Sequence, residues 1–156
     1  MLPGKPDSIM SRTFTISSPH SSSEFLKYYD LRWRILRSPW QQLKGSEQDE
    51  LEDAAFHIMA MEQELIVAVG RLHFINDNSA QIRYMAVESG YEGRGYGTAI
   101  LTALENHAAS HSIKNIVLDA REKAIGFYQK NGYEVIKESH ILYGEIRHFR
   151  MKRELF

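Results

Sequence analysis

The stretch Glu88-Ser-Gly-Tyr-Glu-Gly-Arg-Gly-Tyr-Gly-Thr98 marks the point where the pattern of the chain changes. Before it, Gln81–Val87 alternates two sets of side chains as a strand does, and after it apolar residues recur at helical spacing to about His111. A glycine-rich turn in this position places backbone N–H groups at a helix N-terminus, where the helix dipole attracts phosphate. We therefore predict an anion-binding loop at Gly93–Gly97, the alternative being an ordinary strand-to-helix turn.

Two common nucleotide-binding motifs do not fit this loop. A Walker loop needs Gly-Lys followed by Ser or Thr, and the sequence contains no such run. The dinucleotide fingerprint needs a third small residue three positions after Gly97, where the chain has Ile100, and no βαβ unit begins the chain. The loop is therefore expected to bind a different phosphate-bearing molecule.

The rest of the chain alternates strand and helix patterns. Upstream of the loop, the patterns predict a helix over Glu24–Leu36, which ends before Pro39. They also predict three strands, over Thr13–Ile16, Phe56–Met61 and Leu65–Ile75. Downstream, they predict a helix over Glu122–Lys130 and strands over Asn115–Leu118, Tyr133–Lys137 and Ile146–Met151. This order indicates an α/β (α+β) domain with a mostly antiparallel first half and a crossover helix in the second.

The segment Gly45–Ala55 is rich in Asp and Glu. Acidic runs usually form solvated surfaces. We therefore expect a polar loop here that leads into a short exposed helix.

Length and composition favour one compact domain. With 156 residues, 43% of them hydrophobic, the chain can bury a full core without disulfide or metal support. Residues 1–10 are rich in Pro and Gly and end on a second methionine. We interpret them as a disordered leader, an upstream start or a cloning remnant, and expect the single domain to span 11–156.

Composition also excludes several classes of function. The chain has no cysteine, which excludes disulfide scaffolds, thiolate metal sites and cysteine nucleophiles. The formal net charge of -1 argues against a nucleic-acid partner, in spite of the basic segment Arg147–Arg153. No apolar run approaches the roughly 18 residues of a membrane helix, and a signal-peptide pattern is missing, so we expect a cytoplasmic protein without a membrane partner.

Two ordered motifs resemble the GNAT acyltransferase family, whose members transfer an acyl group from coenzyme A, typically to an amine. The core motif of that family is Gln or Arg, two residues, Gly, one residue, then Gly or Ala. The run Glu92-Gly93-Arg94-Gly95-Tyr96-Gly97 has these glycines, with Glu92 in place of Gln or Arg. The run Ala124-Ile-Gly-Phe-Tyr-Gln-Lys-Asn-Gly-Tyr133 is similar to a later motif of the family. The segment Tyr28–Glu50 also looks like the acetyltransferase domain that some bacteria fuse to a thioesterase-like domain.

The resemblance implies a GNAT-like mixed, mostly antiparallel sheet flanked by helices on both faces, with acetyl-coenzyme A as cosubstrate. It implies that a strand edge pairs with the pantetheine arm and that the glycine loop binds pyrophosphate, which assigns cofactor contacts to Met85, Ala86, Val87, Gly93, Arg94, Gly95, Tyr96, Gly97 and Thr98. Arg121 stands where the family often has Asn. It is predicted to reach a phosphate or a carboxylate, the alternative being a solvated residue at a helix start.

The resemblance also suggests catalytic residues. Tyr128 occupies the position of the tyrosine that protonates the coenzyme A thiolate, and a phenol with a pKa of about 10 keeps its proton at neutral pH. The alternative for Tyr128 is a packed core aromatic. Three candidates remain open for the general base: Glu88 at a strand end, His148 on the last strand, or water. The residues that we expect near the acceptor pocket are Trp33, Arg34, Arg37 and Trp40. The alternative for the two tryptophans is aromatic packing against the core.

His107 and His111 are four residues apart on the helix after the loop, as metal ligands can be. A zincin motif would need Glu at the position of Ala108, and a third ligand is not evident. We therefore expect no metal.

Together these observations predict an N-acetyltransferase that moves an acetyl group from acetyl-coenzyme A to an amine of a small molecule or peptide by direct attack. The alternative is a non-catalytic module that binds acyl-coenzyme A, because Glu92 is an awkward neighbour for pyrophosphate and no base is assigned. The acceptor is not identified, and a homodimer is left open.

Overall fold

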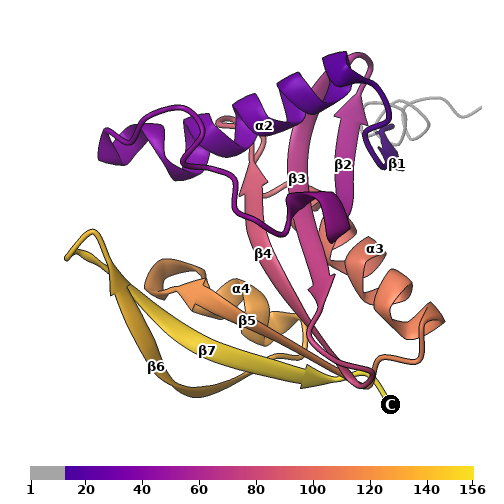
Figure 1. Cartoon of the computed structure of the whole chain (residues 1–156), viewed down its shortest axis with the longest axis vertical. Helices are drawn as coiled ribbons and strands as arrows, with labels where there is room; N and C mark the ends of the chain where they lie inside the picture. The colour runs from indigo at the N-terminus through magenta and orange to yellow at the C-terminus, as the bar shows by residue number, and fades with distance from the viewer. Residues whose placement is uncertain (1–12) are drawn as a thin grey trace, which may run out of the picture.

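The computed structural model describes residues 13–156, and these residues form a seven-stranded sheet with helices on both faces (Figure 1). The strand order is β1-β2-β3-β4-β5-β7-β6. Neighbouring strands are antiparallel except β4 and β5, which are parallel. The strands are β1 Thr15–Ser17, β2 Phe56–Glu62, β3 Leu65–Phe74, β4 Ser79–Val87, β5 Asn115–Arg121, β6 Glu134–Leu142 and β7 Ile146–Glu154. The predicted mixed, mostly antiparallel sheet is confirmed, while the predicted leader at 1–10 lies outside the described residues.

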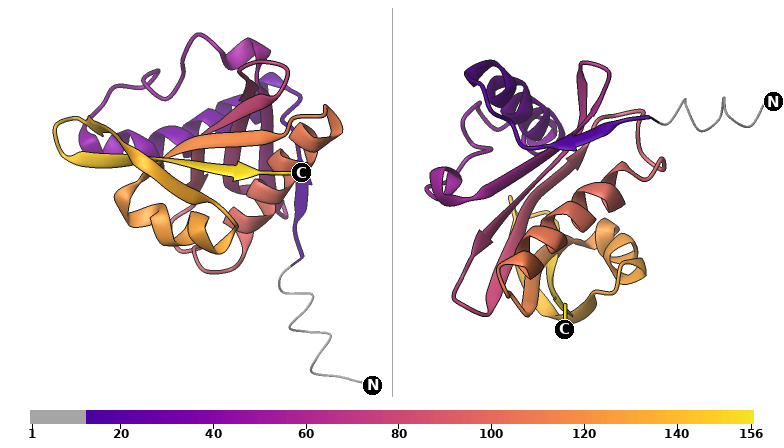
Figure 2. Two further views of the ribbon diagram at one scale, coloured as in Figure 1. Left: turned by 90° about the horizontal axis from the view of Figure 1, so that it is seen from below. Right: turned by 90° about the vertical axis from the view of Figure 1, so that its right-hand side faces the viewer.

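The helices divide between the two faces of the sheet (Figure 2). Helix α2, Ser22–Leu36, packs Tyr28 and Leu31 against one face. Helices α3, Tyr96–Ser110, and α4, Ile125–Lys130, pack against the other face, where the larger part of the core lies. Within residues 13–156, no helix is long and apolar enough to cross a membrane.

A capping box and a proline define the two ends of helix α2. The Ser21 hydroxyl accepts the N–H of Glu24 at 3.0 Å, and the Glu24 carboxylate accepts the N–H of Ser21, which makes a capping box. The helix ends at Leu36, as the sequence predicts, because Pro39 cannot continue it. The chain goes on as the 3-10 helix Ser38–Trp40.

A β-bulge disturbs the pairing of β4. Tyr84 and Met85 lie opposite the single residue Gly70 of β3, and Tyr84 has a φ of 60°, in the left-handed region. A Cβ at Gly70 would come within 2.5 Å of the Ile100 side chain, so glycine is required there. On its other side, β4 pairs with β5 only over Ser79–Ile82. Beyond the bulge the two strands separate (Figure 1).

A buried charge network packs α2 against β3 and β4. The Glu52 carboxylate accepts hydrogen bonds from Arg32 at 2.9 Å and Arg71 at 2.8 Å, and both arginine side chains are fully buried. Their guanidinium carbons lie 4.2 Å and 5.0 Å from the ring centre of Tyr84, in cation–π geometry. The network therefore surrounds the residue that makes the bulge.

The expectation of a solvated acidic segment at Gly45–Ala55 was wrong in part: Glu50 and Asp53 are exposed, but the other carboxylates are not. Glu47 and Glu52 are buried, and Asp49 pairs with Arg71 at 2.6 Å. The predicted short exposed helix is one 3-10 turn whose first residue is buried. The physical reason is that buried guanidiniums need carboxylates beside them, and this segment supplies them.

Strands β5, β6 and β7 are longer than their apolar patterns suggest, and β7 runs to Glu154 instead of Met151. Strand β5 runs to Arg121 instead of Leu118, and β6 runs to Leu142 instead of Lys137. Both extensions pair with β7, so ladder hydrogen bonds define their ends. The helix predicted from Glu122 begins as a 3-10 turn before it becomes α4.

We predict that Glu52→Gln lowers the free energy of unfolding by about 3 kcal/mol, because it removes the negative charge between two buried guanidiniums. Chemical denaturation of the two proteins measures this change. Asp30→Asn is the matched control, since the Asp30 carboxylate is paired with Arg34 but half exposed. If both variants lose equally little stability, the network is not a stabilising unit.

Candidate active site

The end of β4 is a strand edge that no longer pairs with β5 in the described part of the chain. Ala86 and Val87 pair with β3 on one side. On the other side, within the described part of the chain, β5 pairs with β4 no further than Ile82. Backbone groups that point toward β5 beyond that residue are free to pair with an extended ligand. The predicted pantetheine contacts at Met85–Val87 therefore lie at a strand edge that can accept one.

The glycine loop follows this edge directly and ends in α3. Gly93 has a φ of 76° and Gly95 a φ of 91°, so both take the left-handed conformation that favours glycine. Gly95 is the N-cap of α3 and offers no side chain to the first N–H groups of the helix. A Cβ on either glycine would meet no atom of the described residues within 4 Å, so this part of the chain leaves the space above both open. The loop has the donors and the room that a phosphate requires.

The other residues of the loop differ in exposure. Arg94 and Thr98 are exposed. Tyr96 is buried, and its hydroxyl bonds to Glu62, so only its backbone can contact a ligand at the loop. Glu92 is exposed, and its carboxylate accepts the N–H of Gly90 at 2.8 Å. This hydrogen bond holds the Glu92 carboxylate against the turn that precedes it.

Tyr128 lies on α4 between two aromatic rings. Its ring contacts Phe127 and Tyr133 edge-on, with ring centres 5.0 Å and 5.8 Å apart. The side chain is 7% exposed, and burial raises its pKa well above the usual range. Among the described residues, its hydroxyl makes no hydrogen bond. Tyr128 is thus a neutral phenol whose proton is not committed to another group.

Glu88, the first candidate base, is held in an ion pair. Arg34 donates to both of its carboxylate oxygens at 2.9 Å. Arg34 lowers the pKa of Glu88, which makes this carboxylate a weaker base. The pair also connects the last turn of α2 to the end of β4.

His148, the second candidate base, lies on β7 and is 7% exposed. Its Nδ1 is 3.0 Å from the carbonyl oxygen of Ile146. A carbonyl oxygen only accepts, so in the neutral ring Nδ1 carries the proton and Nε2 keeps a lone pair. Burial lowers the pKa of His148, so the ring is neutral at pH 7. The His140 ring stacks on it, with ring centres 4.3 Å apart.

Arg121 lies at the end of β5, directly opposite His148 in the β5–β7 ladder. Its guanidinium points toward α2, where it donates to the carbonyl oxygen of Leu36 at 3.0 Å. Burial lowers the pKa of Arg121, and the positive charge of Arg37 lowers it further. The glycine loop leads into α3 on the opposite face. Arg121 therefore lies near His148 and Arg37 and not beside the glycine loop.

An aromatic contact lies near Arg121. Trp40 and Tyr143 stack at a tilt with ring centres 6.3 Å apart, and Tyr143 belongs to the turn between β6 and β7. Sequence reasoning missed Tyr143; the Tyr143-Gly144 turn between two strand patterns is the signal that points to it. Trp33 has a local role, since its indole N–H donates to the carbonyl of Gln42 at 3.0 Å.

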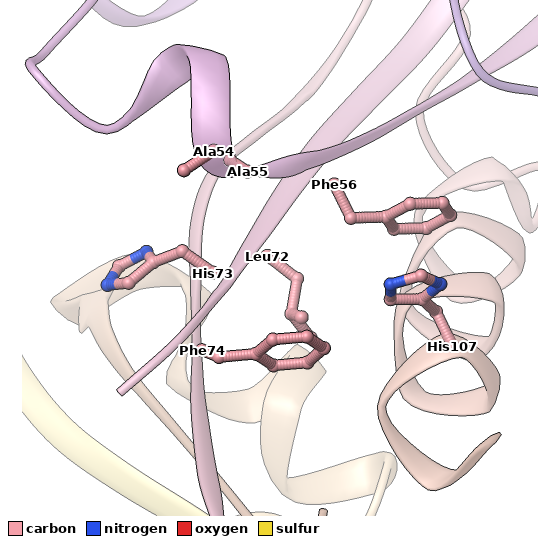
Figure 3. Close-up of a pocket in the computed structure, with 7 residues that line it drawn as sticks. All are labelled: Ala54, Ala55, Phe56, Leu72, His73, Phe74 and His107. Carbon is pink, nitrogen blue, oxygen red and sulfur yellow. The ribbon is translucent and has the colours of Figure 1, made fainter. Parts of the chain in front are cut away.

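The two histidines of α3, His107 and His111, lie away from the glycine loop. His107 stacks on Phe56 with ring centres 3.6 Å apart, in a shallow pocket beside β2 and β3 (Figure 3). His107 is eleven positions after Tyr96, the first residue of α3, so the pocket is about 16 Å along the helix axis from the glycine loop. Among the described residues there is no group of side chains that could hold a metal ion.

Comparisons with known proteins agree with this geometry. A model of the acetyltransferase (GNAT) family matches residues 25–133. The uncharacterized N-acetyltransferase YjcF of Bacillus subtilis (strain 168) is 32% identical over 106 residues, which cover 68% of this chain and 75% of that protein.

Solved structures share the fold. An aminoglycoside 6'-N-acetyltransferase complexed with coenzyme A has a TM-score of 0.77 at 17% identity, covering 91% of this chain and 97% of that one. A GNAT-family acetyltransferase from Staphylococcus aureus MU50 has a TM-score of 0.75 at 19% identity, covering 92% and 100%. At these identities the likeness shows the fold alone.

We predict that Gly95→Ala raises the Kd for coenzyme A at least about tenfold, because a Cβ enters the space in front of the α3 N-terminus. Gly90→Ala is the matched control: Gly90 has a φ of 90° and equally open surroundings, but it lies outside the predicted phosphate contacts. Isothermal titration calorimetry measures both affinities. Equal affinities in the two variants would show that phosphate is bound elsewhere.

Proposed function

Because the chain belongs to the acetyltransferase (GNAT) family, we propose that it is an N-acetyltransferase that moves acetyl from acetyl-coenzyme A to an amine. The observation that carries this proposal is the free edge of β4 next to an uncapped, glycine-lined N-terminus of α3. A long thioester with a phosphate group at its other end needs both features in this order. The closer resemblance to a thioesterase-fused domain stays a prediction.

Each part of the cosubstrate has matching residues. The N–H groups of Gly93–Thr98 suit the pyrophosphate, since they carry the positive end of the α3 dipole. Backbone groups of Met85–Val87 suit the amides of the pantetheine arm. The thioester supplies an activated acetyl group, and an N–H at the end of β4 would polarise its carbonyl. Arg121 lies on the α2 face, which makes it a weaker candidate for the cofactor than for the acceptor.

The amine attacks the acetyl carbonyl directly in this proposal. The new C–N bond forms as the C–S bond breaks, and the amine then gives up one proton. Of the two side chains considered as base, His148 suits this task better, because Nε2 of its neutral ring has a lone pair, whereas Arg34 occupies the Glu88 carboxylate. Water is the remaining alternative.

The departing thiolate needs a proton, and we assign it to Tyr128. The buried phenol keeps its proton at neutral pH because burial disfavours the phenolate. The absence of a hydrogen-bond partner for its hydroxyl among residues 13–156 leaves the proton free for a ligand.

Calorimetric titration with acetyl-coenzyme A, followed by a free-thiol assay against a panel of amines, tests the proposal. Binding with amine-dependent thiol release supports an N-acetyltransferase. Binding without release on any amine favours the non-catalytic acyl-coenzyme A module, and no binding contradicts both.

We predict that Tyr128→Phe lowers kcat by about a hundredfold, because a general acid contributes this much to a proton transfer. The Kd for acetyl-coenzyme A should stay within about twofold, since the ring is kept. Steady-state kinetics and calorimetry measure the two values.

Tyr133→Phe is the matched control for Tyr128→Phe. Tyr133 is also buried and touches Tyr128, but its hydroxyl donates to Glu105 at 2.9 Å. Tyr133→Phe should retain most of the activity. An unchanged kcat in Tyr128→Phe would remove the proton donor from the mechanism.

A further inference from the structure

Two arginines lie together on the α2 face without an acidic partner among the described residues. Arg37 and Arg121 both donate to the carbonyl oxygen of Leu36, at 3.2 Å and 3.0 Å. Arg37 is 8% exposed and Arg121 is half-buried. Within residues 13–156, neither of them forms an ion pair.

The arrangement is unusual for this molecule. The neighbouring arginines on this side of the sheet each have a carboxylate at 2.9 Å or less, in the pairs Arg32–Glu52, Arg34–Glu88, Arg71–Asp49, Arg83–Asp49 and Arg150–Asp119. The donors of Arg37 and Arg121 share one oxygen, so they lie on the order of 6 Å apart or less, where like charges repel. This pair therefore concentrates positive charge with which no carboxylate of residues 13–156 forms an ion pair.

A helix-capping role accounts for only part of the geometry. Leu36 is the last residue of α2, and a guanidinium there satisfies a C-terminal carbonyl. One neutral carbonyl oxygen does not compensate two positive charges. Donors also remain: Arg37 uses Nε on Ser46 and Nη1 on Leu36, and Arg121 uses Nη2 on Leu36. Nη2 of Arg37 and Nε and Nη1 of Arg121 make no hydrogen bond within the described part of the chain and are left for a ligand.

The position of the pair fits the path of an acceptor. Arg121 is paired with His148 across the β5–β7 ladder, at the end of the sheet where β4 and β5 separate. The Trp40–Tyr143 contact lies beside it, where the 3-10 helix after α2 and the β6–β7 turn approach each other (Figure 1). The glycine loop leads to the opposite face, so a cosubstrate bound there leaves this face to the second substrate.

We propose that the acceptor amine carries a carboxylate, as a free amino acid does, and that Arg37 and Arg121 bind it. The planar fork of a guanidinium matches a carboxylate in two parallel hydrogen bonds. The inference rests on the proposed function, because it names the acceptor class of the same site. It also implies discrimination against polyamines, whose second positive charge would meet the two guanidiniums.

Pairs of amines that differ only in the carboxylate test this inference in the thiol-release assay. The pairs are L-phenylalanine and phenethylamine, L-methionine and 3-(methylthio)propylamine, and L-lysine and cadaverine, with phosphoethanolamine and ethanolamine as the phosphate pair. We expect kcat/KM for the acids to exceed that of their partners at least about tenfold, the effect of one charge-assisted bond. In Arg121→Gln this preference should disappear through a rise in KM for the acid.

The controls separate a binding role from a structural one. Arg150→Gln, on the neighbouring strand, removes a guanidinium that Asp119 already neutralises, and should keep the preference. The Kd for acetyl-coenzyme A and the melting temperature of Arg121→Gln should match those of the unchanged protein.

Failure of the inference is distinguishable from failure of the proposed function. If acetyl-coenzyme A does not bind, the function is wrong. If it binds and the decarboxylated amines or phosphoethanolamine react as well as the acids, the acceptor class is wrong while the function stands. If no amine reacts, titration of the acids into protein saturated with coenzyme A decides: binding that Arg121→Gln weakens supports the carboxylate site, and no binding overturns it.

Discussion

The β-bulge at Tyr84 and Met85 is the constraint on which the rest of the site depends. A left-handed φ on tyrosine costs on the order of 1–3 kcal/mol and persists only where its surroundings require it. Here Arg32 and Arg71 surround the Tyr84 ring, and Glu52 holds both guanidiniums. Because the bulge bends β4, that strand separates from β5 and its last residues become a free edge.

The two faces of the sheet then carry different groups of the site. On the α3 side, the glycine loop offers N–H groups and open space for a phosphate. On the α2 side, Arg37, Arg121 and His148 gather at the end of β5. The separated ends of β4 and β5 lie between these two groups, so a thioester bound along the free edge of β4 would meet an amine from the α2 side. The acidic segment contributes to the α2 side, because its carboxylates keep the buried arginines Arg32 and Arg71 in place.

The sequence predicts features that depend on near neighbours. The glycine loop and the end of α2 before Pro39 follow from local spacing, and the mixed sheet follows from the resemblance to the GNAT family; the structure has all three. Features that depend on distant partners were not predictable. The acidic segment looks solvated until Arg32 and Arg71 are placed beside Glu52, and nothing local marks the bulge opposite Gly70. Tyr143 joins the site only through strand pairing that fixes the β6–β7 turn.

Hydrogen–deuterium exchange with and without saturating acetyl-coenzyme A tests the central claim most directly, because it reports on backbone N–H groups. If the free edge of β4 and the glycine loop hold the cosubstrate, exchange slows at Met85–Val87 and at Gly93–Thr98, while β1 and β2 are unchanged. Protection confined to the pocket between Phe56 and His107, with β4 unaffected, would contradict the account.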